Sequence, residues 1–288
     1  MTERNAIIMA AGTSSRFVPL CYEKPKGLLE VKGEVLIERQ IRQLQEAGIK
    51  DITVVVGYKA ELFHYLTVKY GVSLVMNEDY AVYNNTSSLI RVLNRLGNTF
   101  ICCSDNYFPE NVFIPCSEDS FYSALFASGE TDEYCLTVDD KDNITAVQIG
   151  GYDSWYMIGH VFFNKSFSKR FTTIMEEEYM LPETRQGYWE DVYIRHIQEL
   201  PMKIHRYKIG EIHEFDSLDE LRMFDKTYLS NSRSSIIKEI CSTYGWQEQQ
   251  LSDFRKVKHE GGSFLFDFRV GNELFRYDAS LQDKIYKL

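Results

Sequence analysis

Short apolar runs and amphipathic segments alternate through the first hundred residues of the chain. The apolar runs have the length and β-branched content of buried strands, and they cover residues 6–11, 52–56, 72–76 and 99–103. Between them, residues 35–44 and 61–66 place apolar side chains at helical spacing, and residues 84–88 read as a polar cap for a helix over 89–96. Such alternation predicts an α/β fold with a Rossmann-like, mixed but mostly parallel sheet flanked by helices.

The pattern changes near residue 121 and again near residue 230. Alternating polar and apolar positions predict strands over 134–138, 144–149, 155–163 and 203–207, with helices over 165–175 and 189–200. Ser217 and Glu220 have the spacing of a helix N-cap and its capping-box partner. The polar stretch at 230–235 then predicts a boundary between a domain of residues 1–229 and a small α+β appendage of residues 230–288, with a helix over 236–244 and strands over 264–270 and 274–277.

Net charge and the distribution of apolar residues exclude several classes of partner. The 288 residues carry a formal net charge of −10, which argues against binding of nucleic acid, because such proteins need a basic surface to displace counterions. No apolar run approaches the roughly 20 residues of a membrane helix, so we expect no membrane partner. Six cysteines without C-x-x-C spacing predict free thiols and a cytoplasmic location; they are Cys21, Cys102, Cys103, Cys116, Cys135 and Cys241.

The first strand leads into a loop of small and hydroxylated residues. Ala10, Ala11, Gly12, Thr13 and Ser14 let the backbone approach an anion closely. Arg16 and Lys26 add positive charge soon afterwards, so the stretch predicts a site for a nucleoside triphosphate. It matches neither the Walker phosphate loop nor the three-glycine dinucleotide loop.

A second polar stretch, Ser104-Asp105-Asn106, follows the strand over 99–103. Ligands of open parallel sheets gather at the carboxyl ends of the strands, so we expect this stretch to lie beside the first loop. Asp105 would then face the phosphates.

Taken together, these stretches resemble the sugar-nucleotidyltransferase type of enzyme and, within it, the bacterial CTP:phosphocholine cytidylyltransferases. The motifs that carry the resemblance lie within residues 5–228. They are Ala10-Ala11-Gly12-x-x-x-Arg16, Lys24-Pro25-Lys26-x-Leu28-Leu29, Leu36-Ile37-Glu38-Arg39, Ala47-Gly48-Ile49, Tyr83-Asn84-Asn85-x-x-Ser88-Leu89, Ser104-Asp105-Asn106-Tyr107 and Glu214-Phe215-Asp216-Ser217.

The resemblance implies attack of a phosphate oxygen on the α-phosphorus of CTP, with pyrophosphate leaving. It implies Arg16 and Lys26 as catalytic cations, and Asn84, Ser88 and Ser104 as nucleotide contacts beside the first loop. It also implies Mg²⁺ as cofactor, held by Asp105 and Asp216, with Glu214 as a third candidate; carboxylates and phosphates are the ligands this hard cation prefers. Ser14 departs from the family, which carries a second glycine there, and we expect a modified loop that keeps its function.

For the acceptor, the resemblance implies a small phosphorylated amine bound by Tyr134, Trp189 and Glu190. Aromatic faces beside a carboxylate suit the quaternary ammonium of phosphocholine. Tyr134 replaces a tryptophan of the family, so phosphoethanolamine, 2-aminoethylphosphonate and a sugar 1-phosphate stay open as acceptors. An inactive nucleotide-binding scaffold is the alternative from another class. For the appendage, whose Gly261-Gly262 stretch faintly resembles the opening of a choline-kinase-type lobe, formation of a homodimer and coverage of the acceptor both stay open.

Overall fold

The structure is a computed structural model that describes residues 3–113, 118–257 and 264–288, so Cys116 and the stretch Gly261-Gly262 lie outside the described residues. The chain forms two compact units. The first unit comprises residues 1–12 and 36–214, and the second comprises residues 13–35 and 215–288. The boundary expected between residues 229 and 230 divides the chain differently and stays a prediction.

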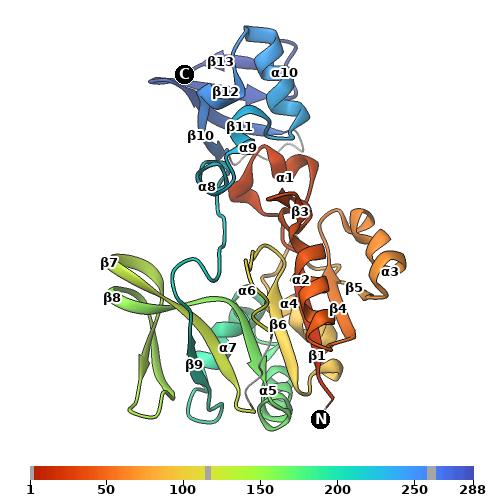
Figure 1. Cartoon of the computed structure of the whole chain (residues 1–288), viewed down its shortest axis with the longest axis vertical. Helices are drawn as coiled ribbons and strands as arrows, with labels where there is room; N and C mark the ends of the chain where they lie inside the picture. The colour runs from red at the N-terminus through yellow and green to blue at the C-terminus, as the bar shows by residue number, and fades with distance from the viewer. Residues whose placement is uncertain (1–2, 114–117, 258–263) are drawn as a thin grey trace. The chain divides into compact units, whose positions relative to one another are not determined.

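A seven-stranded sheet forms the centre of the first unit, in the order β5-β4-β1-β6-β8-β7-β9 (Figure 1). The strands β5, β4, β1 and β6 are parallel, β8 and β7 form an antiparallel hairpin beside them, and β9 is parallel to β7. The prediction of a mixed, mostly parallel sheet is therefore confirmed. The bounds are β1 (Asn5–Ala10), β4 (Asp51–Val56), β5 (Ser73–Met76), β6 (Thr99–Cys103), β7 (Phe121–Val138), β8 (Ile144–Phe163) and β9 (Lys203–Arg206).

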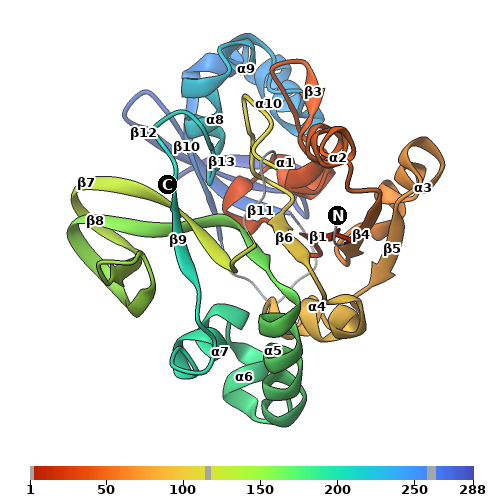
Figure 2. The same cartoon turned by 60° about the horizontal axis from the view of Figure 1, so that its bottom comes forward.

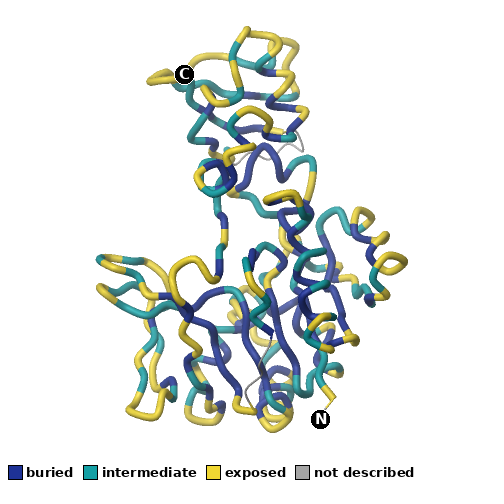
Figure 3. Tube along the Cα trace, viewed as in Figure 1, coloured by how far each residue is buried: buried dark blue, intermediate teal, exposed yellow. Residues whose placement is uncertain are grey.

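Strands β7 and β8 are longer than their sequence pattern predicted. Instead of three short strands over 134–138, 144–149 and 155–163, they form one hairpin of 18 and 20 residues with several shifts of register. Each shift interrupts the two-residue period, and Gly129 and Gly150 adopt positive φ within the strands, so the pattern reads as separate pieces. The far end of this hairpin is largely exposed (Figure 3).

Helices cover both faces of this sheet (Figures 1 and 2). Helices α5 and α7 pack into one apolar core with Ile7, Val55 and Ile101 of the sheet. On the other face, α2 buries Leu36 and Ile41. The helical segments of the first unit are α2 (Leu36–Glu46), η3 (Ala60–Phe63), α3 (Tyr65–Tyr70), α4 (Thr86–Leu89), η4 (Ile90–Arg95), α5 (Lys165–Glu178), α6 (Pro182–Gln186) and α7 (Trp189–Arg195).

Two helix boundaries differ from the expected ones. The helix expected over 89–96 begins at Thr86 and continues from Ile90 as a 3-10 helix, and Asn85 does not cap it because its side chain binds elsewhere. The helix expected over 189–200 ends at Arg195, where His196 leaves helical geometry. No helix among the described residues is both long and apolar enough to cross a lipid bilayer.

The second unit joins the segment 13–35 to the C-terminal part of the chain. Its four-stranded antiparallel sheet has the order β10-β11-β12-β13. Ser217 caps α8 by accepting from the N–H of Glu220, as the sequence predicted. The elements are η1 (Ser15–Phe17), α1 (Leu20–Glu23), η2 (Lys26–Leu28), β2 (Glu30–Val31), β3 (Glu34–Val35), α8 (Leu218–Phe224), α9 (Thr227–Ser230), α10 (Ser235–Tyr244), η5 (Glu248–Gln250), β10 (Leu251–Lys256), β11 (Leu265–Val270), β12 (Glu273–Asp278) and β13 (Ile285–Lys287).

Candidate active site

The first loop and the loop after β6 leave neighbouring strands of the first unit at the same edge. Strands β1 and β6 are parallel and paired, and the N–H of Ser104 donates to the carbonyl of Met9 at 3.1 Å. The expected placement of Ala10, Ala11 and Gly12 beside Ser104 is therefore confirmed. Gly57, at the end of β4, lets this edge pack closely, because a Cβ there would lie 2.9 Å from that of Ala11.

Helix α2 fixes the loop that carries Asp105. The Gln40 side chain donates from Nε2 to the carbonyls of Cys103 at 2.7 Å and Asn106 at 3.0 Å. Arg39 donates to the carbonyls of Phe108 and Pro109, at 2.8 and 2.6 Å. Sequence reasoning missed this role, although the glutamine stands out as a buried polar residue, 1% exposed, within an apolar helix face.

Glu214 lies at this edge as well. Tyr107 and His213 exchange backbone hydrogen bonds of 2.8 and 2.9 Å, and the Asn106 side chain donates from Nδ2 to Glu214 Oε2 at 3.3 Å. Gly159 leaves room for the Asn106 side chain. The φ of Gly159 is +55°, and a Cβ on Gly159 would lie 2.1 Å from Asn106 Oδ1.

Cys103, the last residue of β6, indicates which charges act at this edge. Desolvation and the negative charges of Asp105, Glu214 and Glu190 hold the pKa of the Cys103 thiol well above its usual range. The negative charges of Asp105, Glu214 and Glu190, three of the residues singled out in the sequence, thus all act on this thiol.

The side chains of Asn84 and Ser88 accept hydrogen bonds within the first unit. Asn84 Oδ1 accepts from the N–H of Asn85 at 2.8 Å, and Ser88 Oγ accepts from Asn77 Nδ2 at 2.9 Å. Ser88 is 5% exposed, so its hydroxyl helps to hold α4 in place. The contacts of both residues with a nucleotide stay predictions.

In the second unit, Arg16, Lys26 and Asp216 form one charged cluster. Asp216 Oδ2 lies 2.9 Å from Arg16 Nη1, and Asp216 Oδ1 lies 3.5 Å from Lys26 Nζ. The Lys26 side chain is 8% exposed, whereas that of Arg16 is 76% exposed. The carboxylate of Asp216 beside the nearly buried Lys26 ammonium offsets part of the cost of removing that charge from water.

Glu190, at the start of α7, is held by two neutral donors. The Tyr122 hydroxyl donates to Glu190 Oε1 at 3.0 Å, and Asn85 Nδ2 donates to Oε2 at 3.2 Å. Burial raises the pKa of this carboxyl to about 7, against the lowering effect of these hydrogen bonds. Asn85 also accepts from the N–H of Trp189 at 2.8 Å, so this asparagine joins α4 to α7.

The two aromatic residues expected around the acceptor differ in accessibility. The Trp189 indole is 3% exposed and stacks on Tyr122 at 5.8 Å between ring centroids, within the core of the first unit. Tyr134 is half-buried and donates from its hydroxyl to Asp191 Oδ1 at 3.2 Å. The structure therefore gives Trp189 a packing role beneath Tyr122 and Glu190, and its contact with an acceptor stays a prediction.

Comparisons with known proteins agree with this geometry. Residues 6–116 match the family model of the MobA-like NTP transferase domain. A 2-aminoethylphosphonate cytidylyltransferase of Lancefieldella rimae is 39% identical over 80% of this chain and 95% of the relative. A choline-phosphate cytidylyltransferase of Streptococcus pneumoniae is 33% identical over 77% of this chain and 96% of the relative. The chain belongs to the cytidylyltransferase family of nucleotidyltransferases.

A solved structure supports the same assignment. The CTP:phosphocholine cytidylyltransferase of Streptococcus pneumoniae superposes with a TM-score of 0.75 and 32% identity, over 78% of this chain and 99% of that chain. The four-stranded antiparallel sheet of the second unit is extra with respect to that structure.

In this nucleotidyltransferase, the carboxylates can supply only one or two ligands to Mg²⁺, with the remaining ligands coming from phosphates and water. Among the described residues no three His, Cys, Asp or Glu side chains cluster as they do around a metal held by protein alone. Mg²⁺ at phosphoryl-transfer sites uses one or two carboxylates with substrate phosphates and water. Asp105 is half-buried in the first unit and Asp216 is half-buried in the second, so each can supply a single carboxylate, whereas Glu214 is already bonded to Asn106.

Ser14 adopts the left-handed conformation in which the family carries glycine, with φ 51° and ψ 41°. A β-branched side chain is strained there by about 1–2 kcal/mol, which corresponds to about tenfold in an equilibrium. We therefore expect Ser14→Val to lower kcat/KM for CTP about tenfold and Ser14→Gly to preserve it. Steady-state kinetics at varied CTP concentration measures both, and wild-type constants for the valine variant would show that this conformation is unimportant.

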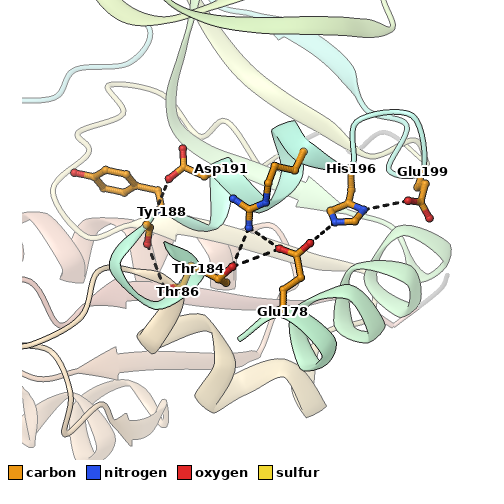
Figure 4. Close-up of polar contacts among 9 residues, drawn as sticks. Thr86, Glu178, Thr184, Tyr188, Asp191, His196 and Glu199 are labelled. Carbon is orange, nitrogen blue, oxygen red and sulfur yellow. Dashed lines mark hydrogen bonds and ion pairs between the residues drawn. The ribbon is translucent and has the colours of Figure 1, made fainter. Parts of the chain in front are cut away.

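The far end of α7 is tied to α5 by an ionic cluster (Figure 4). Glu178 lies 2.5 Å from both Arg195 Nη2 and His196 Nε2, and His196 Nδ1 lies 3.0 Å from Glu199. These carboxylates raise the pKa of His196, chiefly through the hydrogen bond with Glu178. The cluster holds the helix whose first turn carries Glu190.

Because its pKa is raised, the contribution of His196 to the free energy of unfolding depends on pH. Its stabilisation is fully present below the unfolded pKa of about 6.5 and is lost as the pH rises through the higher folded value. We expect His196→Gln to reduce the free energy of unfolding more at pH 6 than at pH 9, as measured by urea denaturation. An equal loss at both values would mean that the imidazole contributes only through neutral hydrogen bonds.

Proposed function

We propose that this nucleotidyltransferase transfers CMP from CTP to a small acceptor that carries a primary amine and a phosphonate or phosphate, with 2-aminoethylphosphonate as the first candidate. An oxygen of the acceptor attacks the α-phosphorus of CTP and forms a new P–O bond. The bond from the α-phosphorus to the bridging oxygen of the β-phosphate breaks, and pyrophosphate leaves with that electron pair. Such a reaction needs positioning and neutralisation of charge rather than a covalent intermediate.

The loop Ala10–Ser14 and the residues Asn84, Ser88 and Ser104 are assigned to the nucleotide. Arg16 and Lys26 neutralise the triphosphate and the charge that grows on the leaving pyrophosphate. Their ion pairs with Asp216 support this assignment, because they hold both cations close together before a nucleotide arrives.

Asp105 of the first unit and Asp216 of the second are each proposed as a carboxylate ligand for Mg²⁺, which would supply charge neutralisation at the phosphates. The loop that carries Asp105 is fixed by hydrogen bonds from α2, so its carboxylate has a defined place at the sheet edge. Glu214, bonded to Asn106, stays a weaker candidate as ligand and adds negative charge at this edge.

The burial of Trp189 is the observation that favours an acceptor with a primary amine. Because the indole is 3% exposed, the first turn of α7 presents the Glu190 carboxylate rather than an aromatic face. A primary ammonium donates three hydrogen bonds and is satisfied by carboxylates, whereas a trimethylammonium group donates none and relies on aromatic faces. Tyr134 uses its hydroxyl to bind Asp191, which is again a polar arrangement.

Phosphocholine is the second candidate acceptor. Tyr134 is half-buried, so its ring can still offer a face to a quaternary ammonium beside Glu190. The pneumococcal relative described above acts on choline phosphate, according to its name.

Purified protein incubated with each of the four ribonucleoside triphosphates, Mg²⁺ and each acceptor tests the proposal. Pyrophosphate release and mass spectrometry of the product are measured together. The expected result is a CMP adduct of 2-aminoethylphosphonate formed faster than any other. Transfer only to a sugar 1-phosphate would overturn the assignment.

A further inference from the structure

Helix α1 lies in the chain between the two cations assigned to the triphosphate, Arg16 and Lys26. Its last residue, Glu23, binds the start of α10 in the same unit. Glu23 Oε2 accepts from the N–H of Ser235 at 2.9 Å and from its hydroxyl at 2.6 Å, and Glu23 Oε1 accepts from the Ser234 hydroxyl and the N–H of Ile236. One carboxylate thus satisfies free donors at a helix N-terminus more than two hundred residues away in sequence.

The charge of Glu23 is stabilised in this position. Burial acts to raise its pKa, but the hydrogen bonds from Ser234, Ser235 and the backbone bring the pKa below its usual value. An anion at the positive end of a helix dipole gains further stabilisation. The link between α1 and α10 is therefore an ionised and fully hydrogen-bonded contact.

Tyr22, the neighbour of Glu23, binds the extra sheet. Its hydroxyl donates to the carbonyl of Leu265 in β11 at 2.9 Å, and its ring stacks on Phe264 with 4.5 Å between centroids and 13° between planes. Helix α1 is thereby attached to α10 through Glu23 and to the sheet through Tyr22.

A second attachment lies just beyond Asp216. In α8, Arg222 is 5% exposed and donates to the carbonyls of Glu248, at 2.8 Å, and Leu251, the first residue of β10. Asp219 Oδ2 accepts from the N–H of Asp253 at 2.8 Å. Both segments that carry the Arg16–Lys26–Asp216 cluster are thus anchored to the part of the unit formed by α10 and β10–β13.

We propose that α10 and the sheet β10–β13 are a brace for the triphosphate site, and that Glu23 is a positioning residue that keeps Arg16 and Lys26 in place for CTP. This inference rests on the proposed function, since it assigns the cluster to CTP. The pneumococcal structure superposes on 78% of this chain and lacks the extra sheet, so the brace is a feature that this chain has in addition to the fold of that relative.

Glu23→Gln tests the brace in the full chain, with Glu239→Gln as matched control. Glu239 lies in α10 and pairs with Lys284 at 2.6 Å, so its variant also removes a carboxylate from this part of the unit but leaves α1 untouched. We expect Glu23→Gln to raise KM for CTP about tenfold, because small misplacements of positioning groups have effects of this order or larger. KM for the acceptor is expected to stay unchanged, as are both constants in the control.

Hydrogen exchange provides a readout that does not depend on turnover. In Glu23→Gln, the backbone amides of residues 13–35 should exchange faster while those of β1 and β4 keep their protection. If Glu23→Gln lowers only the melting temperature and KM for CTP stays at the wild-type value, the brace is overturned. If Glu23→Gln does not fold, Tyr22→Phe, which loses only the hydroxyl contact, is measured in the same way and must raise KM for CTP.

Failure of the proposed function gives a different experimental result from failure of the brace. In that case the wild-type protein transfers CMP to no acceptor, and isothermal titration with CTP and Mg²⁺ replaces the kinetic measurement. Tighter binding of CTP to wild type than to Glu23→Gln would still support the brace, and equal binding would overturn it.

Discussion

Lys26→Met is expected to lower kcat about 10³-fold, because it removes a charge from the triphosphate site while keeping the length of the side chain. Loss of one preorganised donor to a developing charge has effects of about 10²–10³ in other enzymes, and we expect the upper value here because water screens the charge of the nearly buried Lys26 less than that of an exposed lysine. Steady-state kinetics with CTP and the acceptor in excess measures the effect.

The control for Lys26→Met is Lys32→Met, in the same unit. Lys32 is exposed and its ammonium lies over the ring of Phe224, at 5.0 Å from the centroid, so we expect wild-type kcat. Circular dichroism and the melting temperature show whether each variant is folded. A folded Lys26→Met with more than a tenth of wild-type kcat would remove Lys26 from the catalytic residues.

Glu190→Gln is expected to lower kcat/KM for the acceptor about 10²-fold and to raise the melting temperature at pH 8. The amide cannot pair with an ammonium group, which accounts for the first effect. The second follows from the raised pKa: ionisation of this carboxyl costs stability as the pH rises from the unfolded pKa of about 4.3 to the folded value of about 7, and the full loss is present at pH 8, where the amide carries no charge.

The same variant gives a test by pH. In the wild type, kcat/KM for the acceptor should rise between pH 6 and pH 8 as Glu190 ionises, and this rise should be smaller in Glu190→Gln. Glu183→Gln, on the exposed side of α6, is the control and should follow the wild type. An unchanged kcat/KM for Glu190→Gln would place the ammonium elsewhere.

The sequence predicted those parts of the site that depend on strand order. A parallel sheet brings the ends of neighbouring strands to one edge, so the placement of Gly12 beside Ser104 followed from the apolar pattern alone. The capping of α8 by Ser217 is a local contact and was equally predictable. Such features need only local spacing and the geometry of a sheet.

Other parts depend on contacts between distant residues, and no local pattern encodes them. Asn85 was expected as part of a helix cap, but its side chain binds Glu190 and the N–H of Trp189, about a hundred residues later. Residues 13–35 were predicted to lie in a domain of residues 1–229, and the structure groups them in a compact unit with residues 215–288. Contacts of Glu23 and Tyr22 with the C-terminal elements explain that grouping.

A competition experiment tests the proposed acceptor most directly. The protein is given CTP, Mg²⁺ and an equimolar mixture of 2-aminoethylphosphonate, phosphoethanolamine and phosphocholine, and the initial rates of the three CMP products are measured by mass spectrometry. We predict that the product of 2-aminoethylphosphonate forms fastest and that of phosphocholine slowest. A mixture dominated by CDP-choline would contradict the assignment of Glu190 and its polar surroundings to a primary ammonium.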